Sequence, residues 1–243
     1  MDSSFPNISS TLLGELPKET WWGSDLYNWE GFWFASSRLS PVMAARSNFQ
    51  ASDDDVFLTS STKTGTTGLK AIIPTIMNPK GRYFEATSLI LCYQDLLRTL
   101  LARLCILLET QRTGLFHCGT LRTAGLMLWE KSLRRPVKIL VLRFEDLKKD
   151  PKVLVKKLAS FLGRPFANEE EVDKVLWRCS LERLKNLEVN QNGVDPWLGI
   201  NYKFHFRRGI VGDWENNITE EMKEKLDQVT RMKFEGSGLD FAH

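Results

Sequence analysis

The sequence lacks the marks of several protein classes. Its 243 residues carry a net charge of only +3, from 33 basic and 30 acidic residues, which is too small a surplus to predict nucleic-acid binding. The most apolar run, residues 89–108, is interrupted by Gln94, Asp95, Arg98 and Arg103, so we expect no membrane span. The first residues have no basic start and no apolar stretch, so we expect no signal peptide.

Cysteine and histidine are also scarce. Four cysteines stand at irregular spacing that fits no zinc pattern, and no secretion signal precedes them, so we expect reduced thiols in a cytoplasmic protein. The three histidines are His117, His205 and His243. Any preference for anions must come from a local site, because the bulk charge is too weak to produce one.

What the chain does have is an alternation of strand-like and helical patterns, over a length that fits one large domain or two small ones. The strand-like runs are residues 55–61 and 137–147; the helical patterns are residues 69–77, 150–163, 168–188 and 219–234. This order predicts an α/β fold with a parallel sheet. We expect Pro74 to break or kink the first helix. The aromatic run at residues 21–34 indicates either core or the wall of an apolar pocket.

The segment "TKTGTTG", residues 62–68, lies between the first strand-like run and the first helix. A strand, a short glycine-containing loop and a helix direct backbone N–H groups and the helix dipole at an anion. Lys63 adds a point charge, and Thr64, Thr66 and Thr67 add hydroxyl donors. The order of residues is not that of the common nucleotide P-loop. The alternative is an ordinary turn from strand to helix.

A second candidate for anion binding is "FHFRRGIVGDW", residues 204–214. Arg207 and Arg208 stand beside Gly209, and a guanidinium group binds a terminal phosphate through two parallel hydrogen bonds. Taken alone, the segment is equally consistent with a solvated basic turn.

Several stretches together resemble the cytosolic sulfotransferases, most closely the plant type. These stretches are residues 31–34, 55–72, 128–166, 179–193 and 206–214, with "GSGLDF" near the end. The resemblance implies a single α/β sulfotransferase domain over residues 1–243, with a central parallel sheet flanked by helices and a phosphate-binding strand–loop–helix. It implies transfer of a sulfuryl group from 3'-phosphoadenylyl sulfate (PAPS) to a hydroxyl of a small molecule such as a phenol, flavonoid or steroid. No metal and no nucleic acid are implied.

The resemblance also assigns roles to residues. Lys63 would neutralise the oxygen of the leaving phosphosulfate, as the catalytic residue. Thr64, Gly65, Thr66 and Thr67 would hold the 5'-phosphate, and Arg207, Arg208 and Gly209 the 3'-phosphate. Ser180, in the matching "CSL" phrase, is the remaining candidate for binding the co-substrate.

The chain departs from the family at four places. Gly68 stands where the family has a tryptophan beside the adenine, and Leu181 where it usually has an aromatic residue. Neither the "THLP"-like phrase with the histidine base nor the "RNPKD" phrase with a 3'-phosphate arginine occurs. Loss of a positioned general base costs about 10²–10⁴-fold in rate, and we do not expect His117, His205 or His243 to replace it.

The missing phrases belong in the region of residues 83–126, which has an irregular character. Codons exist for which the neighbouring reading frame spells versions of the missing phrases in the correct order. Our hypothesis is that residues 83 to about 123 are out-of-frame translation, with further shortening nearby. Residues 96–109, "LLRTLLARLCILLE", look more helical than extended, so we expect the sheet to lack a central strand.

Two functional hypotheses follow. In the first, the chain is a sulfotransferase whose activity is impaired by the absent base and phosphate segment. In the second, it is an inactive remnant that at most binds 3'-phosphoadenosine phosphates. A generic P-loop hydrolase is disfavoured because the glycine–lysine–threonine order is absent. The sequence leaves the acceptor and the oligomeric state open.

Overall fold

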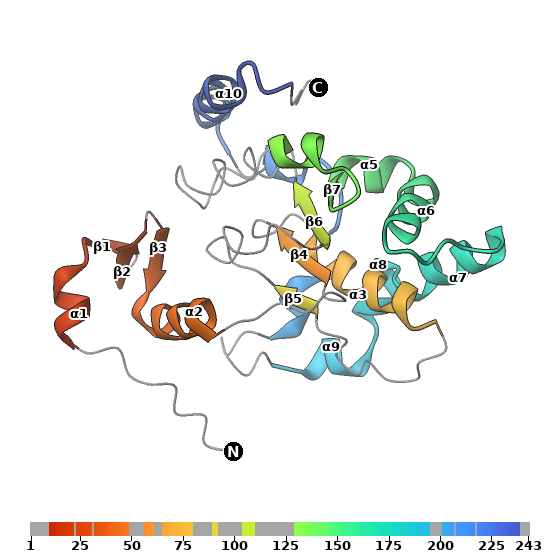
Figure 1. Ribbon diagram of the computed structural model, residues 1–243, viewed down its shortest axis with the longest axis horizontal. Coiled ribbons are helices and arrows are strands. Elements are labelled where there is room, and N and C mark those ends of the chain that lie inside the picture. Colours follow the sequence, from red (N-terminus) through yellow and green to blue (C-terminus); the bar gives the residue numbers. More distant parts are fainter. Residues whose placement is uncertain are drawn as a thin grey trace. The chain divides into compact units, whose positions relative to one another are not determined.

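Figure 1 shows the chain as a computed structural model. The structure describes residues 10–21, 23–30, 32–48, 56–60, 65–79, 89–91, 104–109, 129–194, 201–206, 208–216 and 218–238. The chain divides into two compact units, residues 1–54 with 92–101, and residues 55–91 with 102–243. That residues 1–243 form one sulfotransferase domain stays a prediction.

The first unit is built around a small antiparallel sheet of order β1-β2-β3. Its elements are α1 Ser10–Glu15, β1 Lys18–Trp21, β2 Ser24–Trp29, β3 Phe32–Ala35 and α2 Ser36–Asn48. The aromatic run at residues 21–34 supplies most of this sheet. Its described aromatic side chains, such as Trp29 and Trp33, are half-buried, and whether they form core or a pocket wall stays a prediction. Leu39 of α2 is fully buried.

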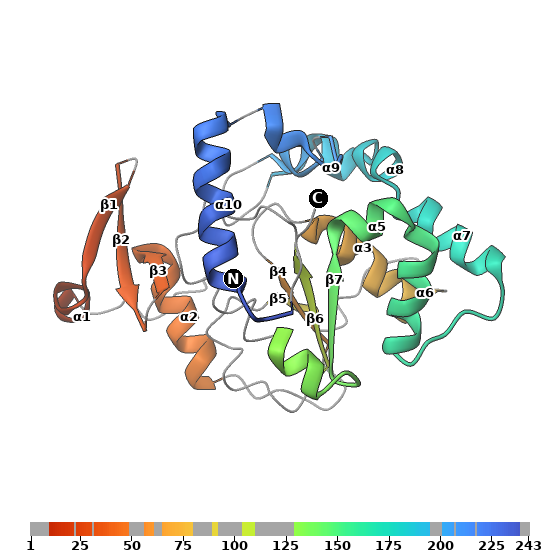
Figure 2. The same cartoon turned by 90° about the horizontal axis from the view of Figure 1, so that it is seen from above.

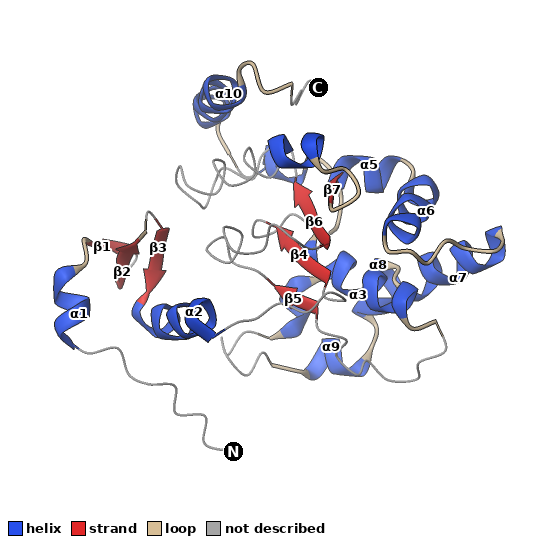
Figure 3. Cartoon of the chain, in the orientation of Figure 1, coloured by secondary structure: helices blue, strands red, loops and turns tan. Residues whose placement is uncertain are grey.

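The second unit contains a parallel sheet of order β5-β4-β6-β7 (Figure 3). The strands are β4 Val56–Ser60, β5 Leu89–Leu91, β6 Leu104–Glu109 and β7 Ile139–Arg143. Every neighbouring pair is parallel, so the predicted α/β fold with a parallel sheet is confirmed. Because parallel strands end at the same edge of a sheet, the carboxyl ends of β4 and β7 lie at one edge.

The prediction that the sheet lacks a central strand is wrong. β6 pairs with β4 from Val56↔Leu104 to Ser60↔Leu108, and with β7 from Cys105↔Ile139 to Glu109↔Arg143. Its sequence, "LCILLE", is a short continuous apolar run, which a strand buried on both faces of a parallel sheet accepts as readily as a helix does. The rest of the segment expected to be helical, residues 96–103, lies outside the described residues.

A cluster of buried apolar side chains in the second unit lies on one face of this sheet. Three helices contribute to it: α3 Thr66–Met77, α6 Pro151–Phe161 and α7 Glu169–Arg178. They lie on the same side of the strands in Figure 2. The strand residues facing them are Val56, Leu58, Leu140 and Leu142, which follow the period of two expected for one face of a strand. This packing fixes α3, the helix that follows the predicted phosphate loop.

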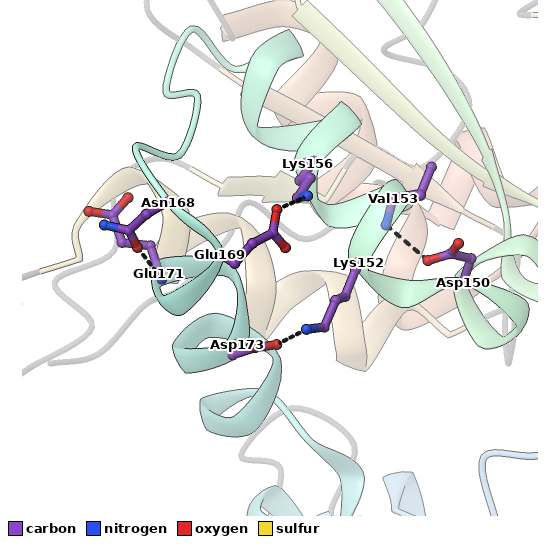
Figure 4. Close-up of polar contacts among 8 residues, drawn as sticks. All are labelled: Asp150, Lys152, Val153, Lys156, Asn168, Glu169, Glu171 and Asp173. Carbon is purple, nitrogen blue, oxygen red and sulfur yellow. Dashed lines mark hydrogen bonds and ion pairs between the residues drawn. The ribbon is translucent and has the colours of Figure 1, made fainter.

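Short polar contacts set the ends of α6 and α7 (Figure 4). Asp150 accepts a hydrogen bond from Val153 N at 3.1 Å, as a capping side chain does before proline in the first turn. Asn168 caps α7 in the same way through Glu171 N at 3.0 Å. The ion pair Lys152–Asp173, at 2.6 Å, joins the two helices, as does the pair between Lys156 and Glu169.

The other expected helices and strands differ at their bounds. The helix at Pro74 continues from Thr66 to Met77 and is not broken. The strand-like run 137–147 ends at Arg143, and α5 Phe144–Lys149 follows it. The expected helix 168–188 is divided into α7, α8 Leu181–Lys185 and α9 Glu188–Asn192. The division occurs where Ser180, in an extended conformation, caps α8 with its own side chain.

The remaining elements are η3 Tyr202–His205, η4 Asp213–Asn216 and α10 Glu220–Phe234. The expected cap of the last helix is confirmed, because Thr219 Oγ1 accepts a hydrogen bond from Met222 N at 3.2 Å. None of the helices in the described part of the chain combines the length and apolarity needed to cross a membrane.

Candidate anion-binding site

Of the turn between β4 and α3, the structure describes only the last residue, Gly65. Gly65 precedes the helix with φ 97° and ψ 12°, in the left-handed region that favours glycine. Its carbonyl oxygen accepts the first helical hydrogen bond, from Gly68 N at 3.0 Å. The chain therefore enters α3 abruptly at this glycine.

The first turn of α3 presents donors that the helix itself does not use. The N–H groups at the start of a helix have no carbonyl one turn back, and the helix dipole makes this end favourable for negative charge. Thr66 and Thr67 form this turn and are half-buried. The other two predicted loop residues, Lys63 and Thr64, lie outside the described residues.

The predicted 3'-phosphate segment is only partly described. Arg207 lies outside the described residues. Arg208 pairs with Asp213 through Nη1 and Oδ1 at 3.1 Å; the arginine side chain is 64% exposed and the aspartate 12%. Gly209 follows with φ +60°. The arginine thus has a counter-ion but remains accessible to a solute, as a phosphate-binding group must be.

Leu181, which follows Ser180 in the chain, lies against this segment at Gly209. A Cβ atom placed on Gly209 would stand 2.8 Å from Leu181 Cδ2, so the leucine side chain would have to shift. Ser180 itself caps α8, its Oγ accepting a hydrogen bond from Arg183 N at 3.3 Å. The structure therefore brings Gly209 against Leu181, the residue that follows Ser180; that Ser180 binds the co-substrate stays a prediction.

This neighbourhood is connected to α3 by a buried contact. Cys179 Sγ donates to Thr75 Oγ1 at 3.5 Å, and Arg178 Nη1 donates to Pro79 O at 3.1 Å. Burial raises the pKa of the Cys179 thiol, and the hydrogen bond with Thr75 opposes that shift. Thr75 is nine residues after Thr66, about 13 Å along a helix. These contacts therefore connect the residues around Cys179 to the second half of α3.

One further charged residue stands at the same sheet edge and was missed by the sequence reasoning. Arg143 is the last residue of β7, and the structure describes no hydrogen-bond partner for its buried Nε atom. The only signal in the sequence is that an arginine ends the apolar run "ILVLR". An unpaired buried charge cannot be recognised before the fold is known.

His205 is the only histidine among the described residues. It ends η3, is exposed, and its ring lies 6.4 Å from that of Tyr202. His205 stands three residues before Arg208, within the predicted 3'-phosphate segment. That it is not the general base stays a prediction. Within the described ranges, no three His, Cys, Asp or Glu side chains gather as a metal site would require.

The fold is that of an α/β protein with a parallel sheet, and comparison with known proteins makes the class specific. The sulfotransferase domain family matches residues 93–238. Flavonol 4'-sulfotransferase of Flaveria chlorifolia is 30% identical, over 88% of this chain and 89% of that protein. The chain belongs to the sulfotransferase family.

Two further relatives extend the comparison. Cytosolic sulfotransferase 1 of Arabidopsis thaliana is 29% identical over 320 residues, covering 99% of this chain and 96% of that protein. A mouse sulfotransferase whose crystal structure contains PAP is 21% identical and has a TM-score of 0.65, covering 87% of this chain and 95% of that one. The alignment with the Arabidopsis protein exceeds the 243 residues of the chain by 77 positions; the shortening itself stays a prediction.

Proposed function

We propose that the chain binds PAPS and slowly transfers its sulfuryl group to the hydroxyl of a small molecule in the cytoplasm. The observation that carries this proposal is the left-handed Gly65 at the start of α3. It places backbone donors for one phosphate at the start of that helix, while Arg208 and Gly209 supply a second anion-binding group. PAPS carries phosphates at two separate positions, and the fit to two segments supports it.

The chain's residues would then have distinct roles. Gly65, Thr66 and Thr67, with Thr64, would hold the 5'-phosphate at the helix N-terminus. Arg208, with Arg207 and Gly209, would hold the 3'-phosphate, and Ser180 would add a hydroxyl. Lys63 would neutralise the charge that collects on the phosphate oxygen when the sulfur–oxygen bond breaks.

Transfer also needs the acceptor hydroxyl to lose its proton while its oxygen bonds to sulfur. No histidine stands in a phrase that resembles the family's base. We therefore propose that turnover is low, by about 10²–10⁴-fold relative to an enzyme with a positioned base. Binding of the co-substrate does not need the base and would survive.

The alternative is a remnant that binds 3'-phosphoadenosine phosphates without catalysis. Two features favour it: the absent "RNPKD" phrase, and Leu181 and Gly68 at positions where the family has aromatic residues. Both proposals predict binding of PAP, so only catalysis separates them. For the acceptor, we propose a phenol, flavonoid or hydroxylated steroid, because a flavonol sulfotransferase is among the relatives.

The deciding experiment has two arms. Binding of PAP is measured by calorimetry, and transfer of labelled sulfate from PAPS is measured with a panel of phenols, flavonoids and hydroxysteroids. We expect measurable PAP binding and slow transfer that Lys63→Met abolishes. Turnover at an ordinary enzyme's rate would contradict the impairment, absence of transfer would favour the remnant, and absence of PAP binding would refute both.

The origin of residues 83–123 is tested separately. Sequencing the genomic DNA and the transcript shows whether the neighbouring frame spells the missing phrases. If it does, a corrected gene expressed beside the present chain should recover at least about 10²-fold in transfer rate. A neighbouring frame without the histidine and arginine phrases would refute the frameshift hypothesis while leaving the binding proposal intact.

A further inference from the structure

Arg143 ends β7 at the carboxyl edge of the sheet, where an anion bound at that edge would contact its side chain. Leu108 pairs with both Ser60 and Leu142, so Arg143 stands one residue beyond the level at which β4 ends. β6 alone separates β4 from β7, which puts the two strands about 10 Å apart. An arginine side chain can cover most of that distance.

A structural arginine normally has a hydrogen-bond or ion-pair partner, and none is described for Arg143. The side chain is half-buried and its Nε atom is fully buried, yet no hydrogen bond or ion pair is described for it. A guanidinium group stays charged at all ordinary pH values, and leaving a buried charged donor unpaired is costly. Such a group is expected to bind an anion.

The face of the sheet from which the Arg143 side chain projects indicates which anion it would bind. Leu140 and Leu142 belong to the core shared with α3, and side chains alternate along a strand. Arg143 therefore leaves the sheet on the face opposite α3. In the proposed function, the 5'-phosphate of PAPS is held at the start of α3. The sulfonate is the third anionic group of PAPS, and it extends beyond the 5'-phosphate.

We propose that Arg143 donates a hydrogen bond to the sulfonate of PAPS and so distinguishes PAPS from the product PAP, which lacks this group. This inference rests on the proposed function, because it requires that PAPS binds at the carboxyl edge of the sheet. Arg143 is then a substrate-binding residue for the group that is transferred. A bound water molecule is the alternative partner for Nε, and it would give Arg143 no preference between the two nucleotides.

The test compares the two nucleotides on one variant. Affinities of the full-length chain for PAP and PAPS are measured by calorimetry without acceptor, for wild type, Arg143→Met and Arg164→Met. We expect Arg143→Met to weaken PAPS binding about tenfold or more, since charged hydrogen bonds have that effect, and to change PAP binding less than twofold. Arg164 is exposed beyond the end of α6, so its variant removes the same charge and should leave both affinities unchanged.

Thermal unfolding of the ligand-free proteins supplies a second readout. Replacing an unpaired buried charge by methionine should leave the midpoint unchanged or raise it, whereas loss of a structural arginine would lower it. Equal weakening of PAP and PAPS, or no weakening of either, would overturn the role of Arg143. Failure of wild type to bind PAP would instead refute the proposed function.

Discussion

The two predicted anion-binding regions of the second unit use opposite physical means. At the start of α3 the donors are backbone N–H groups, and the helix behind them is anchored by Leu69, Ile72, Ile73 and Ile76, all 5% exposed or less. At residues 208–213 the donor is a side chain, Arg208, which is 64% exposed and held by one ion pair. The first region is fixed by the core, and the second is set by surface contacts.

This difference has consequences for how each region responds to change. Backbone donors in a packed helix are pre-organised and depend on the conformation of one glycine. An exposed guanidinium group is attracted to phosphate through water and is screened by salt. We therefore expect the α3 region to resist salt and fail on backbone changes, and the Arg208 region to show the reverse pattern.

The largest effect is expected at Gly65. Valine at φ 97° is strained, because a β-branched residue is a genuine outlier in that region. Gly65→Val should reduce PAP affinity about 30-fold or more, since the first turn of α3 must change to relieve the strain. Calorimetry measures the affinity and urea denaturation the stability.

The matched control for Gly65 is Gly163, which follows α6 with φ +68° and where an added Cβ atom would meet nothing within 4 Å. Gly163→Val carries comparable strain away from the site. It should cost about 1–3 kcal/mol of stability and leave PAP affinity unchanged. If both variants lose affinity in proportion to stability, α3 has no special role in binding.

A smaller loss is expected at Gly209, where the second region contacts α8. Alanine there meets both a positive φ and Leu181 Cδ2 at 2.8 Å. Gly209→Ala should weaken PAP binding about tenfold to 30-fold, because the contact that places Arg208 beside α8 must open. Gly238→Ala has a similar φ, +70°, with nothing within 4 Å, and should leave binding intact. Equal affinities for the two variants would contradict the predicted role of this contact.

The next effect in size is expected from removing the guanidinium group of Arg208. Arg208→Ala should weaken PAP binding about tenfold in low salt, and the loss should shrink at high ionic strength. Stability should change by less than about 1 kcal/mol, as for other exposed ion pairs. Asp213→Asn should bind PAP slightly more tightly than wild type, since it releases Arg208. Tighter binding by Arg208→Ala would show that this arginine does not face the phosphate.

The same contrast explains what the sequence could predict. The turn at Gly65 follows from local chemistry, because a strand, a glycine loop and a helix occur together in one short segment. The helix caps at Asp150 and Thr219 were predictable for the same reason. Features determined by neighbouring residues in the chain could be read directly.

Features determined by distant residues could not. The apolar run of β6 has no period that distinguishes a buried strand from a buried helix, and only its pairing with β4 and β7 decides the matter. The contact between Gly209 and Leu181, and the unpaired Nε of Arg143, likewise exist only in the folded chain. Ser180 was found by resemblance, but its role as the cap that divides α7 from α8 was not foreseen.

The smallest effect concerns Cys179, which connects α3 to the corner that carries Ser180. Burial raises the pKa of its thiol in the folded state above the unfolded value. The neutral thiol is thus favoured by folding, so its contribution to stability is fully present below the unfolded pKa, about 8.5, and is lost as pH rises through the folded pKa. Cys179→Ala removes this dependence, and its unfolding free energy in urea with reductant should fall less than that of wild type between about pH 8 and pH 10. The other three cysteines are common to both proteins, so the difference isolates Cys179. Parallel profiles would mean that the thiol contact with Thr75 is open to water, and that the connection between the two anion-binding regions is looser than the hydrogen bond at 3.5 Å indicates.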